Sequence, residues 1–333
     1  MTNSLTRKLV VAIVTYNSED VVDHCLSALT RGLPANTQIV VVDNSSSDQT
    51  RLIVRRHSPV TLLENSRNVG FAVAVNMVAA DVSQSCDLLL LNPDAAISGE
   101  AVARLQLVLS EEPRIGAVAP LVSQPSGRTE VMQAGHQPTI RRMLFHYSGI
   151  SRTFGRRWPF LRGHYLYQDS IAMDRSTAVE WASGGCLMVR GSLWRDLGGL
   201  DESWFMYVED TELCNRIRQR GSDVRIVPWI QATHSVGSSA RKSASSISGM
   251  WITNLMEYYA RDLAPSRLAV YVWKAICVVG LLSRSAGFFV RSLRVKSVTP
   301  VDWRGEARRF LIYALLLAKH PVPPNQTLGN SGA

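Results

Sequence analysis

The chain has 333 residues, of which 46% are hydrophobic and 14 are proline, so it is long enough to bury the core of about two domains. This composition excludes a collagen-like, low-complexity or wholly disordered protein. The net charge of +9 is regional: residues 1–260 carry 25 basic and 24 acidic side chains, whereas residues 261–333 carry 11 and 3. A neutral body with a basic tail argues against a broad nucleic-acid surface and for a local anionic partner, most simply lipid headgroups.

The first 120 residues alternate apolar runs, typical of buried strands, with segments that have the period of helices. We expect the first helix to be capped by Ser18 and to stop at Gly32. Fully apolar strands that alternate with helices predict a largely parallel sheet covered on both faces. The expected strands are residues 9–14, 39–42, 60–63, 88–91 and 116–119, and the expected later helices are 48–56, 71–80 and 99–110.

Residues 131–168 differ from this region, because they combine arginines with aromatic residues and contain no acidic residue. They predict an insertion beside the sheet that faces an anionic, partly apolar ligand, although a solvated surface loop would have the same composition. After the insertion, short apolar segments typical of strands and helices return. We expect a strand at 186–189, a helix at 211–220 and a strand at 224–227. The chain is therefore divided into an α/β domain, residues 1–243, and a helical, basic C-terminal region, residues 244–333.

In the C-terminal region, residues 268–282 are strongly apolar but are interrupted by Lys274 and followed by Arg284 and Arg291. The run falls short of the roughly 18 uncharged apolar residues of a spanning helix, so we expect it to lie at a membrane interface. A helix packed on the body with a basic face in solvent is the alternative. For the interfacial case, the side chains expected to insert are Ile276, Val279, Leu281, Phe288 and Phe289.

Polar residues cluster directly after the expected strands, where open parallel sheets bind their ligands. The clusters lie at 15–17, 43–48, 65–71 and 92–94. Asp43, at a strand end, is able to accept a hydrogen bond from the N–H of a pyrimidine ring. Each cluster taken alone is also typical of a turn followed by a helix cap. The glycine-rich dinucleotide and P-loop motifs do not occur, and the five cysteines form no C-x-x-C pair, which favours reduced, buried thiols over a zinc site.

Six segments taken together resemble the family 2 glycosyltransferases of the GT-A fold, and within them the bacterial rhamnosyltransferase-like branch. They are VAIVTYNSED, VVVDNSSSD, ENSRNVGFAVAVN, LLLNPDA, ASGGCLMVR and GGLDESWFMYVEDTELCNRIRQRG, followed by a strand and His234. The resemblance covers residues 8–237. It implies an α/β fold of the GT-A type, with a mostly parallel nucleotide-binding sheet flanked by helices, here followed by a helical membrane-associating extension.

The resemblance also implies site residues. Asp94 corresponds to the last acid of the family's D-x-D metal motif, but Asn92 replaces the first acid, which weakens the expected affinity for Mg²⁺ or Mn²⁺. His234 is implied as a second metal ligand, although a lone histidine at this place is also typical of a hydrogen-bonded edge residue. The implied donor-binding residues are Thr15, Asn17, Asp43, Asn44, Arg67, Gly70, Asn92 and Asp94, and the implied acceptor-binding residues are Ser183, Gly184, Gly185 and Trp204.

Asp210 is implied as the general base that takes the proton of the acceptor hydroxyl, with Glu209 orienting the acceptor or the loop. The helix dipole alone also favours acids at a helix start.

The implied reaction is inverting transfer of L-rhamnose from dTDP-L-rhamnose to a saccharide on a polyprenyl diphosphate, in cell-envelope polysaccharide synthesis. The enzyme would act as a peripheral protein on the cytoplasmic face of the inner membrane, and an oligomer is compatible with this role. Its residues do not distinguish rhamnose from galactofuranose, mannose or N-acetylglucosamine. Two other classes are open. A nucleotidyltransferase would carry a glycine-rich basic loop where this chain has Thr15 to Ser18, and a non-catalytic scaffold would be expected to have lost Asp94 or Asp210.

Overall fold

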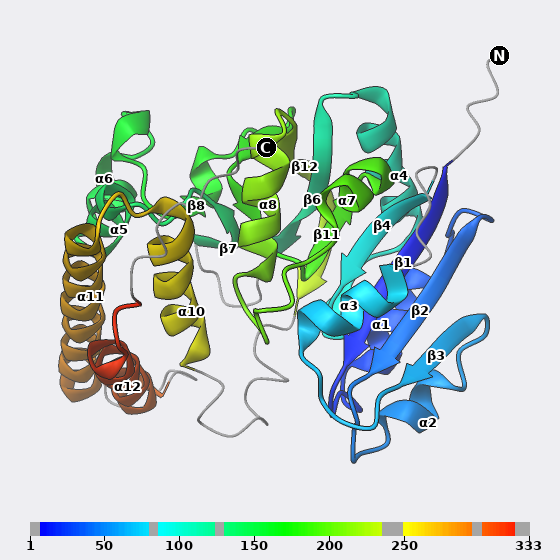
Figure 1. Cartoon of the computed structure of the whole chain (residues 1–333), viewed down its shortest axis with the longest axis horizontal. Helices are drawn as coiled ribbons and strands as arrows, with labels where there is room; N and C mark the ends of the chain where they lie inside the picture. The colour runs from blue at the N-terminus through cyan, green and yellow to red at the C-terminus, as the bar shows by residue number, and fades with distance from the viewer. Residues whose placement is uncertain (1–6, 80–85, 124–129, 235–248, 295–301, 324–333) are drawn as a thin grey trace, which may run out of the picture. The chain divides into compact units, whose positions relative to one another are not determined.

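The computed structural model describes residues 7–79, 86–123, 130–234, 249–294 and 302–323 (Figure 1). The chain forms two compact units. The first comprises residues 1–135 and 166–244, and the second comprises residues 136–165 and 245–333. Most of the arginine-rich insertion therefore belongs to the same unit as the C-terminal helices, whereas we expected it beside the sheet.

A nine-stranded sheet forms the centre of the first unit, in the order β3-β2-β1-β4-β11-β6-β12-β5, with β9 paired to β12. Strands β1 to β4 run parallel to one another, and β6 is parallel to β12, so the prediction of a largely parallel sheet is confirmed. β11 is antiparallel to both of its neighbours, and the short β5 is antiparallel to β12. The strands are β1 Lys8–Thr15, β2 Thr37–Asp43, β3 Val60–Glu64, β4 Cys86–Leu91, β5 Ala95–Ala96, β6 Ile115–Ser123, β9 Thr177–Val179, β11 Cys186–Val189 and β12 Asp223–His234.

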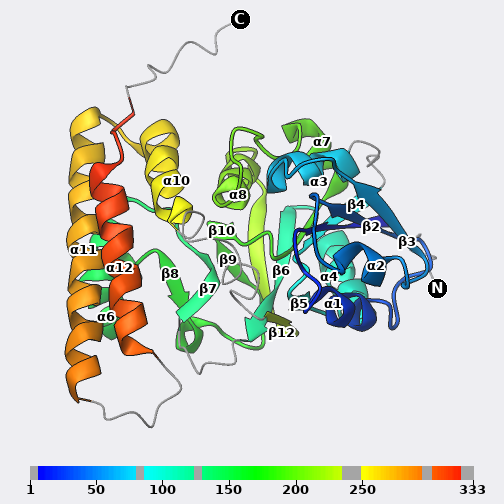
Figure 2. The ribbon, with the colours of Figure 1, turned by 90° about the horizontal axis from the view of Figure 1, so that it is seen from below.

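Helices cover both faces of this sheet. In Figure 2, α1, α2 and α4 lie on one face, and α3 and α7 lie on the other. Alternate residues of β1, among them Leu9 and Val11, are buried in one core cluster with Leu26 of α1 and Leu105 of α4. The helices are α1 Val22–Leu29, α2 Thr50–Val54, α3 Phe71–Ala79, α4 Gly99–Glu111, α7 Gly191–Leu197 and α8 Glu209–Gln219.

One expected cap is wrong. α1 begins at Val22 without a side-chain cap, because the Ser18 hydroxyl donates to the Tyr16 carbonyl and the Ser18 N–H donates to Thr50 Oγ1. Ser18 thus joins the loop after β1 to α2 instead of starting a helix. The expected burial of the cysteines is confirmed, since all five are buried.

A smaller sheet has the strand order β10-β7-β8, in which β7 is Glu130–Gly135, β8 is Tyr165–Tyr167 and β10 is Trp181–Ala182. A short 3₁₀ helix, η2, spans Gln168–Ser170.

The second unit is helical. Its centre is Trp273, which is fully buried, stacks on Tyr259 at 5.4 Å and donates from Nε1 to the Pro138 carbonyl. Helices α11 and α12 lie side by side in both views (Figures 1 and 2). The elements are α5 Ile140–Tyr147, α6 Ile150–Phe154, the 3₁₀ helix η1 Pro159–Leu161, α10 Met250–Tyr258, the π-helix η3 Tyr259–Leu263, α11 Arg267–Arg294 and α12 Trp303–Lys319.

Candidate active site

The carboxyl ends of the parallel strands bring most of the predicted site residues to one edge of the sheet. The register pairs Thr15 with Asp43 across β1 and β2. β11 runs in the opposite direction, so it begins at this edge, where Cys186 pairs with Leu91 at the end of β4. The segments after β1, β2 and β4 and the segment before β11 therefore meet, as the sequence analysis expected of a parallel sheet.

Asp43 is the buried carboxylate of this edge, with 0% of its surface exposed. It accepts hydrogen bonds from Thr15 Oγ1 at 3.0 Å, from the Ser46 N–H at 2.9 Å and from the Ser46 hydroxyl at 2.5 Å, and the Arg51 guanidinium lies 3.7 Å away. These contacts satisfy part of its acceptor capacity and fix the turn that follows β2. Ser46 and Arg51 were not among the predicted residues, since a serine in a serine run and an arginine in a short helix carry no distinct signal.

The predicted amides tie three loops together. Asn17 has a left-handed backbone, with φ of 49°, and its Oδ1 accepts from the Ser47 N–H at 2.8 Å. Asn44 Nδ2 donates to the Gly70 carbonyl at 3.1 Å, and Asn44 Oδ1 accepts from Asn65 Nδ2 at 2.9 Å. The loops after β1, β2 and β3 are thus held by side-chain hydrogen bonds. Among them, Arg67 is exposed.

Gly70 joins this region to the segment that precedes α8. Its φ is +89°, and a Cβ at this position would lie 2.5 Å from the Phe205 carbonyl oxygen. The Phe71 N–H donates to that same oxygen at 2.8 Å. A side chain at residue 70 would therefore separate the two segments, which is a physical reason for glycine here.

Asp210 lies in the first turn of α8 and is held by backbone donors. Its Oδ2 accepts from the Gly184 N–H at 2.9 Å, and its Oδ1 accepts from the Thr211 N–H at 2.6 Å. Burial raises the pKa of Asp210 above its ordinary value, while these hydrogen bonds and one with Ser183 act in the opposite direction. The result is a fixed carboxylate that is more basic than an exposed aspartate.

Glu209 differs from its neighbour. It is buried, and its Oε2 has no hydrogen-bond partner among the described residues. Burial and the adjacent charge of Asp210 raise the pKa of Glu209 to about 8. At neutral pH Glu209 is therefore mostly protonated.

The turn that leads into these two acids has an unusual backbone. Tyr207 and Val208 have φ values of 68° and 77°, in the left-handed region that β-branched residues rarely adopt. Their side chains give no sequence signal for this conformation, so it was not predicted.

The predicted acceptor residues lie on the segment that precedes β11. Asn92, after β4, donates its N–H to the Gly185 carbonyl at 3.0 Å, and a Cβ on Gly184 would meet Phe71 and Asp210 at about 3.5 Å. Trp204 is buried in the loop before α8. The structure thus brings Ser183 to Gly185 against Asp210 and Asn92.

The predicted metal ligands come from neighbouring positions. The register of β5 and β12 pairs the backbone of His234 with Ala95, next to Asp94, while the side chain of His234 lies outside the described residues. Asp94 is half-buried. Within the described part of the chain, no group of three His, Cys, Asp or Glu side chains could hold a metal alone. Asp94 and His234 are residue types that bind Mg²⁺ or Mn²⁺, so a shared metal site remains a prediction.

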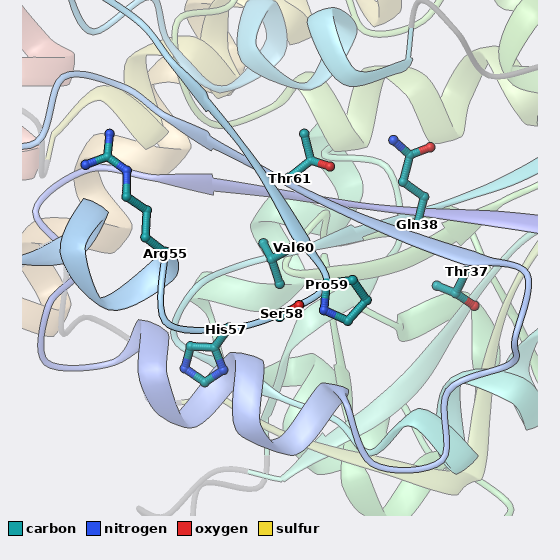
Figure 3. Close-up of a pocket in the computed structure, with 8 residues that line it drawn as sticks. All are labelled: Thr37, Gln38, Arg55, His57, Ser58, Pro59, Val60 and Thr61. Atoms are coloured by element: carbon teal, nitrogen blue, oxygen red, sulfur yellow. The ribbon is translucent and has the colours of Figure 1, made fainter.

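A surface hollow of about 430 Å³ lies elsewhere, around the start of β2 and β3 (Figure 3). It is lined by Thr37, Gln38, Arg55, His57, Ser58, Pro59, Val60 and Thr61. These residues mark the amino ends of β2 and β3, whereas the site residues follow the carboxyl ends. The hollow is therefore separate from the candidate active site.

Residues 10–179, about half of the chain, match the family described as glycosyl transferase family 2. The chain belongs to that family. It is therefore a glycosyltransferase, and its sheet is the GT-A type of α/β fold that the motifs implied.

Curated relatives of this glycosyltransferase include bacterial and archaeal proteins. N-acetylglucosaminyl-diphospho-decaprenol L-rhamnosyltransferase of Mycobacterium tuberculosis is 28% identical over 73% of this chain and 80% of its own length. The low-salt glycan biosynthesis hexosyltransferase Agl10 of Haloferax volcanii is 27% identical over 68% of the chain and 66% of its own length. Rhamnosyltransferase WbbL of Escherichia coli is 32% identical over a shorter stretch, 28% of the chain and 35% of its own length.

Solved structures share the fold at low identity. The mannosyltransferase PcManGT from Pyrobaculum calidifontis, in complex with GDP-Man and Mn²⁺, has a TM-score of 0.58 and 16% identity, covering 95% of this chain and 88% of that one. GalNAc-T7 with UDP, GalNAc and Mn²⁺ has a TM-score of 0.55 and 14% identity, covering 97% and 60%. A divalent metal is consistent with these structural neighbours of the glycosyltransferase.

Proposed function

We propose that this glycosyltransferase transfers L-rhamnose from dTDP-L-rhamnose to a saccharide carried on a polyprenyl diphosphate, with inversion at the anomeric carbon. The observation that carries the proposal is Asp210, a half-buried carboxylate held by the Gly184 N–H at the carboxyl edge of a family 2 sheet. The identity of the sugar and acceptor is supported by the mycobacterial relative, which matches across 73% of this chain and whose name specifies both.

In the proposed step, Asp210 accepts the proton of an acceptor hydroxyl while that oxygen attacks C1 of the sugar. The C1–O bond to the diphosphate breaks, and the nucleoside diphosphate leaves with the bonding electron pair. Asp210 suits this role because its raised pKa makes it a stronger base and its two backbone hydrogen bonds fix its direction. Glu209, protonated at neutral pH, does not compete as a base, and we assign it to positioning the turn.

On the donor side, we assign Thr15, Asn17 and Asp43 to the nucleotide and Arg67 and Gly70 to the ribose and diphosphate. Their support is the set of hydrogen bonds that joins the loops after β1, β2 and β3. In this assignment the Asp43 carboxylate accepts a hydrogen bond from a pyrimidine N–H. It would use acceptor capacity that Thr15 and Ser46 leave open.

A divalent cation bound with the donor would be held by Asp94, with His234 as the proposed second ligand. When bound, it would stabilise the negative charge that develops on the leaving diphosphate. Asn92 cannot act as an anionic ligand, so we expect the donor's own oxygens to supply much of the coordination.

We place the enzyme on the cytoplasmic face of the membrane as a peripheral protein, next to its lipid-linked acceptor. The support is the basic region of residues 261–333 and the acceptor named for the mycobacterial relative.

The test is a transfer assay with the full chain and polyprenyl-diphosphate-linked N-acetylglucosamine. Four donors are compared: dTDP-L-rhamnose, UDP-galactofuranose, GDP-mannose and UDP-N-acetylglucosamine. We expect the product to gain one deoxyhexose by mass spectrometry, and Asp210→Asn to abolish that gain. If only a hexose or an N-acetylhexosamine is transferred, the proposed donor sugar is wrong and the transferred sugar takes the place of rhamnose in the assignment. No transfer, together with no donor-induced thermal shift, would favour a non-catalytic scaffold.

A further inference from the structure

Most of the exposed side chains of α11 form one continuous apolar band. Between Leu268 and Val290 every exposed residue of this fully described helix is uncharged, and apart from Ser283 and Gly287 these residues, with Leu293, are apolar and make up the band. Their spacing of three, four and seven residues places them on one side of the helix. We call these residues the α11 stripe: Leu268, Tyr271, Val272, Ala275, Val279, Leu282, Ala286, Phe289, Val290 and Leu293.

The other faces of α11 are packed inside the second unit. Towards α5, Arg284 donates to His146 Nε2 at 2.7 Å and lies over the Tyr147 ring. Towards α12, Lys274 Nζ donates to the carbonyls of Ala318 and His320 at 2.9 and 2.8 Å. Because protein covers these faces, the α11 stripe is the apolar face that α11 leaves exposed among the described residues.

This packing changes which side chains could enter a lipid surface. Of the five residues expected from the sequence, Leu281 is 0% exposed and belongs to the core of the unit. Ile276 and Phe288 are half-buried, and Phe288 stacks on Trp303 at 5.7 Å. Val279 and Phe289 are exposed, at 62% and 54%. The sequence showed an apolar run, and the structure shows which side of it faces outwards.

Basic side chains gather at the two ends of the α11–α12 pair. Arg291, at the end of α11, lies 5.6 Å from the ring of Trp303, at the start of α12, and exposed Arg294, Arg304 and Arg308 belong to the same two helix ends. The opposite ends carry exposed Arg267 and Lys319. The described acids near the first of these ends are Asp302, which caps α12 by accepting from the Gly305 N–H, and Glu306, which is paired with Arg309. Basic ends around a charge-free middle complement an anionic lipid surface.

We propose that the α11 stripe docks the protein on an anionic membrane with α11 parallel to the membrane plane. The biological role of this docking rests on the proposed function, because the acceptor proposed there is lipid-linked. The test below measures lipid contact and not sugar transfer, so the docking and the proposed function can each be refuted without the other. Within the described residues α11 is the one helix long and apolar enough to span a bilayer. Spanning would place Lys274 and Arg284, with their partners on α12 and α5, at membrane depth, which is costly.

A second copy of the chain fits the α11 stripe less well. Both ends of the α11–α12 pair are basic, so a symmetric dimer through this face would bring like charges together in either direction. Lipid headgroups avoid this repulsion, because they are anionic and mobile.

The orientation is tested by depth measurement. Leu268→Cys, Val279→Cys and Phe289→Cys are prepared singly in the full chain and labelled with an environment-sensitive fluorophore. The native cysteines are all buried, which limits background labelling. Leu268 and Phe289 are about 30 Å apart along a helix, close to the thickness of the hydrocarbon core. With lipids quenching at defined depths, the proposal predicts equal, shallow depths for all three labels. A deep Val279 label between two shallow ones would show that α11 spans and would overturn the proposal.

The partner is tested by co-sedimentation with vesicles of phosphatidylcholine, alone or with phosphatidylglycerol. Val279→Glu and Phe289→Glu should each weaken binding to the anionic vesicles about tenfold or more, and high salt should release the wild type. Leu107→Glu and Leu52→Glu are matched controls, since these residues are 52% and 48% exposed on the first unit, and they should bind as the wild type does. Circular dichroism and melting curves check the folding of each variant.

Two results would reject the lipid partner. One is wild-type binding below detection on anionic vesicles at low salt. The other is a dimer in light scattering that Val279→Glu separates into monomers, which would assign the α11 stripe to a second copy.

Discussion

Replacing Glu209 with glutamine should stabilise the protein more at higher pH, because the change removes a buried carboxyl whose pKa is raised to about 8. The ordinary value is 4.5, so the folded chain holds this proton more tightly than the unfolded chain does. The stabilisation from proton binding is fully present below pH 4.5 and is lost as the pH rises through about 8. The expected slope is about 1.4 kcal/mol per pH unit, or about 3 kcal/mol between pH 5 and pH 7.

The measurement is urea unfolding of wild type and Glu209→Gln at about pH 5.5, 6.5 and 7.5, followed by a signal from the first unit. Titrating groups that do not interact with Glu209 are common to both proteins, so they cancel in the difference between the two free energies of unfolding, whereas Asp210 is coupled to Glu209 and contributes to that difference. Glu111→Gln, the same change at an exposed position of α4, provides the reference. A Glu209→Gln difference that stays constant over this pH range would refute a protonated Glu209.

Three further predictions concern the reaction. Asp210→Asn should lower turnover by about 10²- to 10⁴-fold with little change in affinity for the nucleotide sugar, measured by transfer assay and calorimetry, and a variant that retains more than about a tenth of the activity would place the base elsewhere. Asp94→Ala and His234→Ala should each weaken the dependence of activity on Mg²⁺ or Mn²⁺, and full wild-type activity in excess chelator would contradict a metal site. Asp43→Ala should weaken nucleotide binding by about 1 to 3 kcal/mol and also lower the melting temperature, since Thr15 and Ser46 lose their acceptor. Equal wild-type affinity for ADP- and dTDP-sugars would contradict the recognition of a pyrimidine by Asp43.

The parts of the fold that follow from local pattern were predictable from the sequence. Apolar runs gave β1 to β4 because a strand buried on both faces leaves few places for polar residues. The start of α1 was not predictable from the sequence. Ser18 can either cap a helix or form hydrogen bonds with residues distant in the chain, and the conformation of the folded loop determines which of these occurs. The reversed direction of β11 was likewise set by tertiary pairing with β4 and β6.

The candidate site shows the same division. The carboxylates and amides after the strands were identified because their residue types differ from the apolar runs before them. Ser46, Arg51 and the Phe205 carbonyl were missed, because their roles arise from contacts between loops that are distant in sequence. The grouping of residues 136–165 with the C-terminal helices was missed for a similar reason, since composition alone does not say which surface an insertion packs against.

The left-handed pair Tyr207–Val208 has an implication for how this enzyme can be improved or can evolve. Each left-handed residue of this kind costs about 1 to 2 kcal/mol, so glycine at either position would relieve strain and, if the turn kept its shape, raise the melting temperature. The same glycine would widen the range of directions open to the first turn of α8, where Asp210 lies. Selection for heat resistance and selection for turnover should therefore favour different residues at these two positions, and a thermostable lineage that acquires glycine there should do so at the expense of catalytic rate.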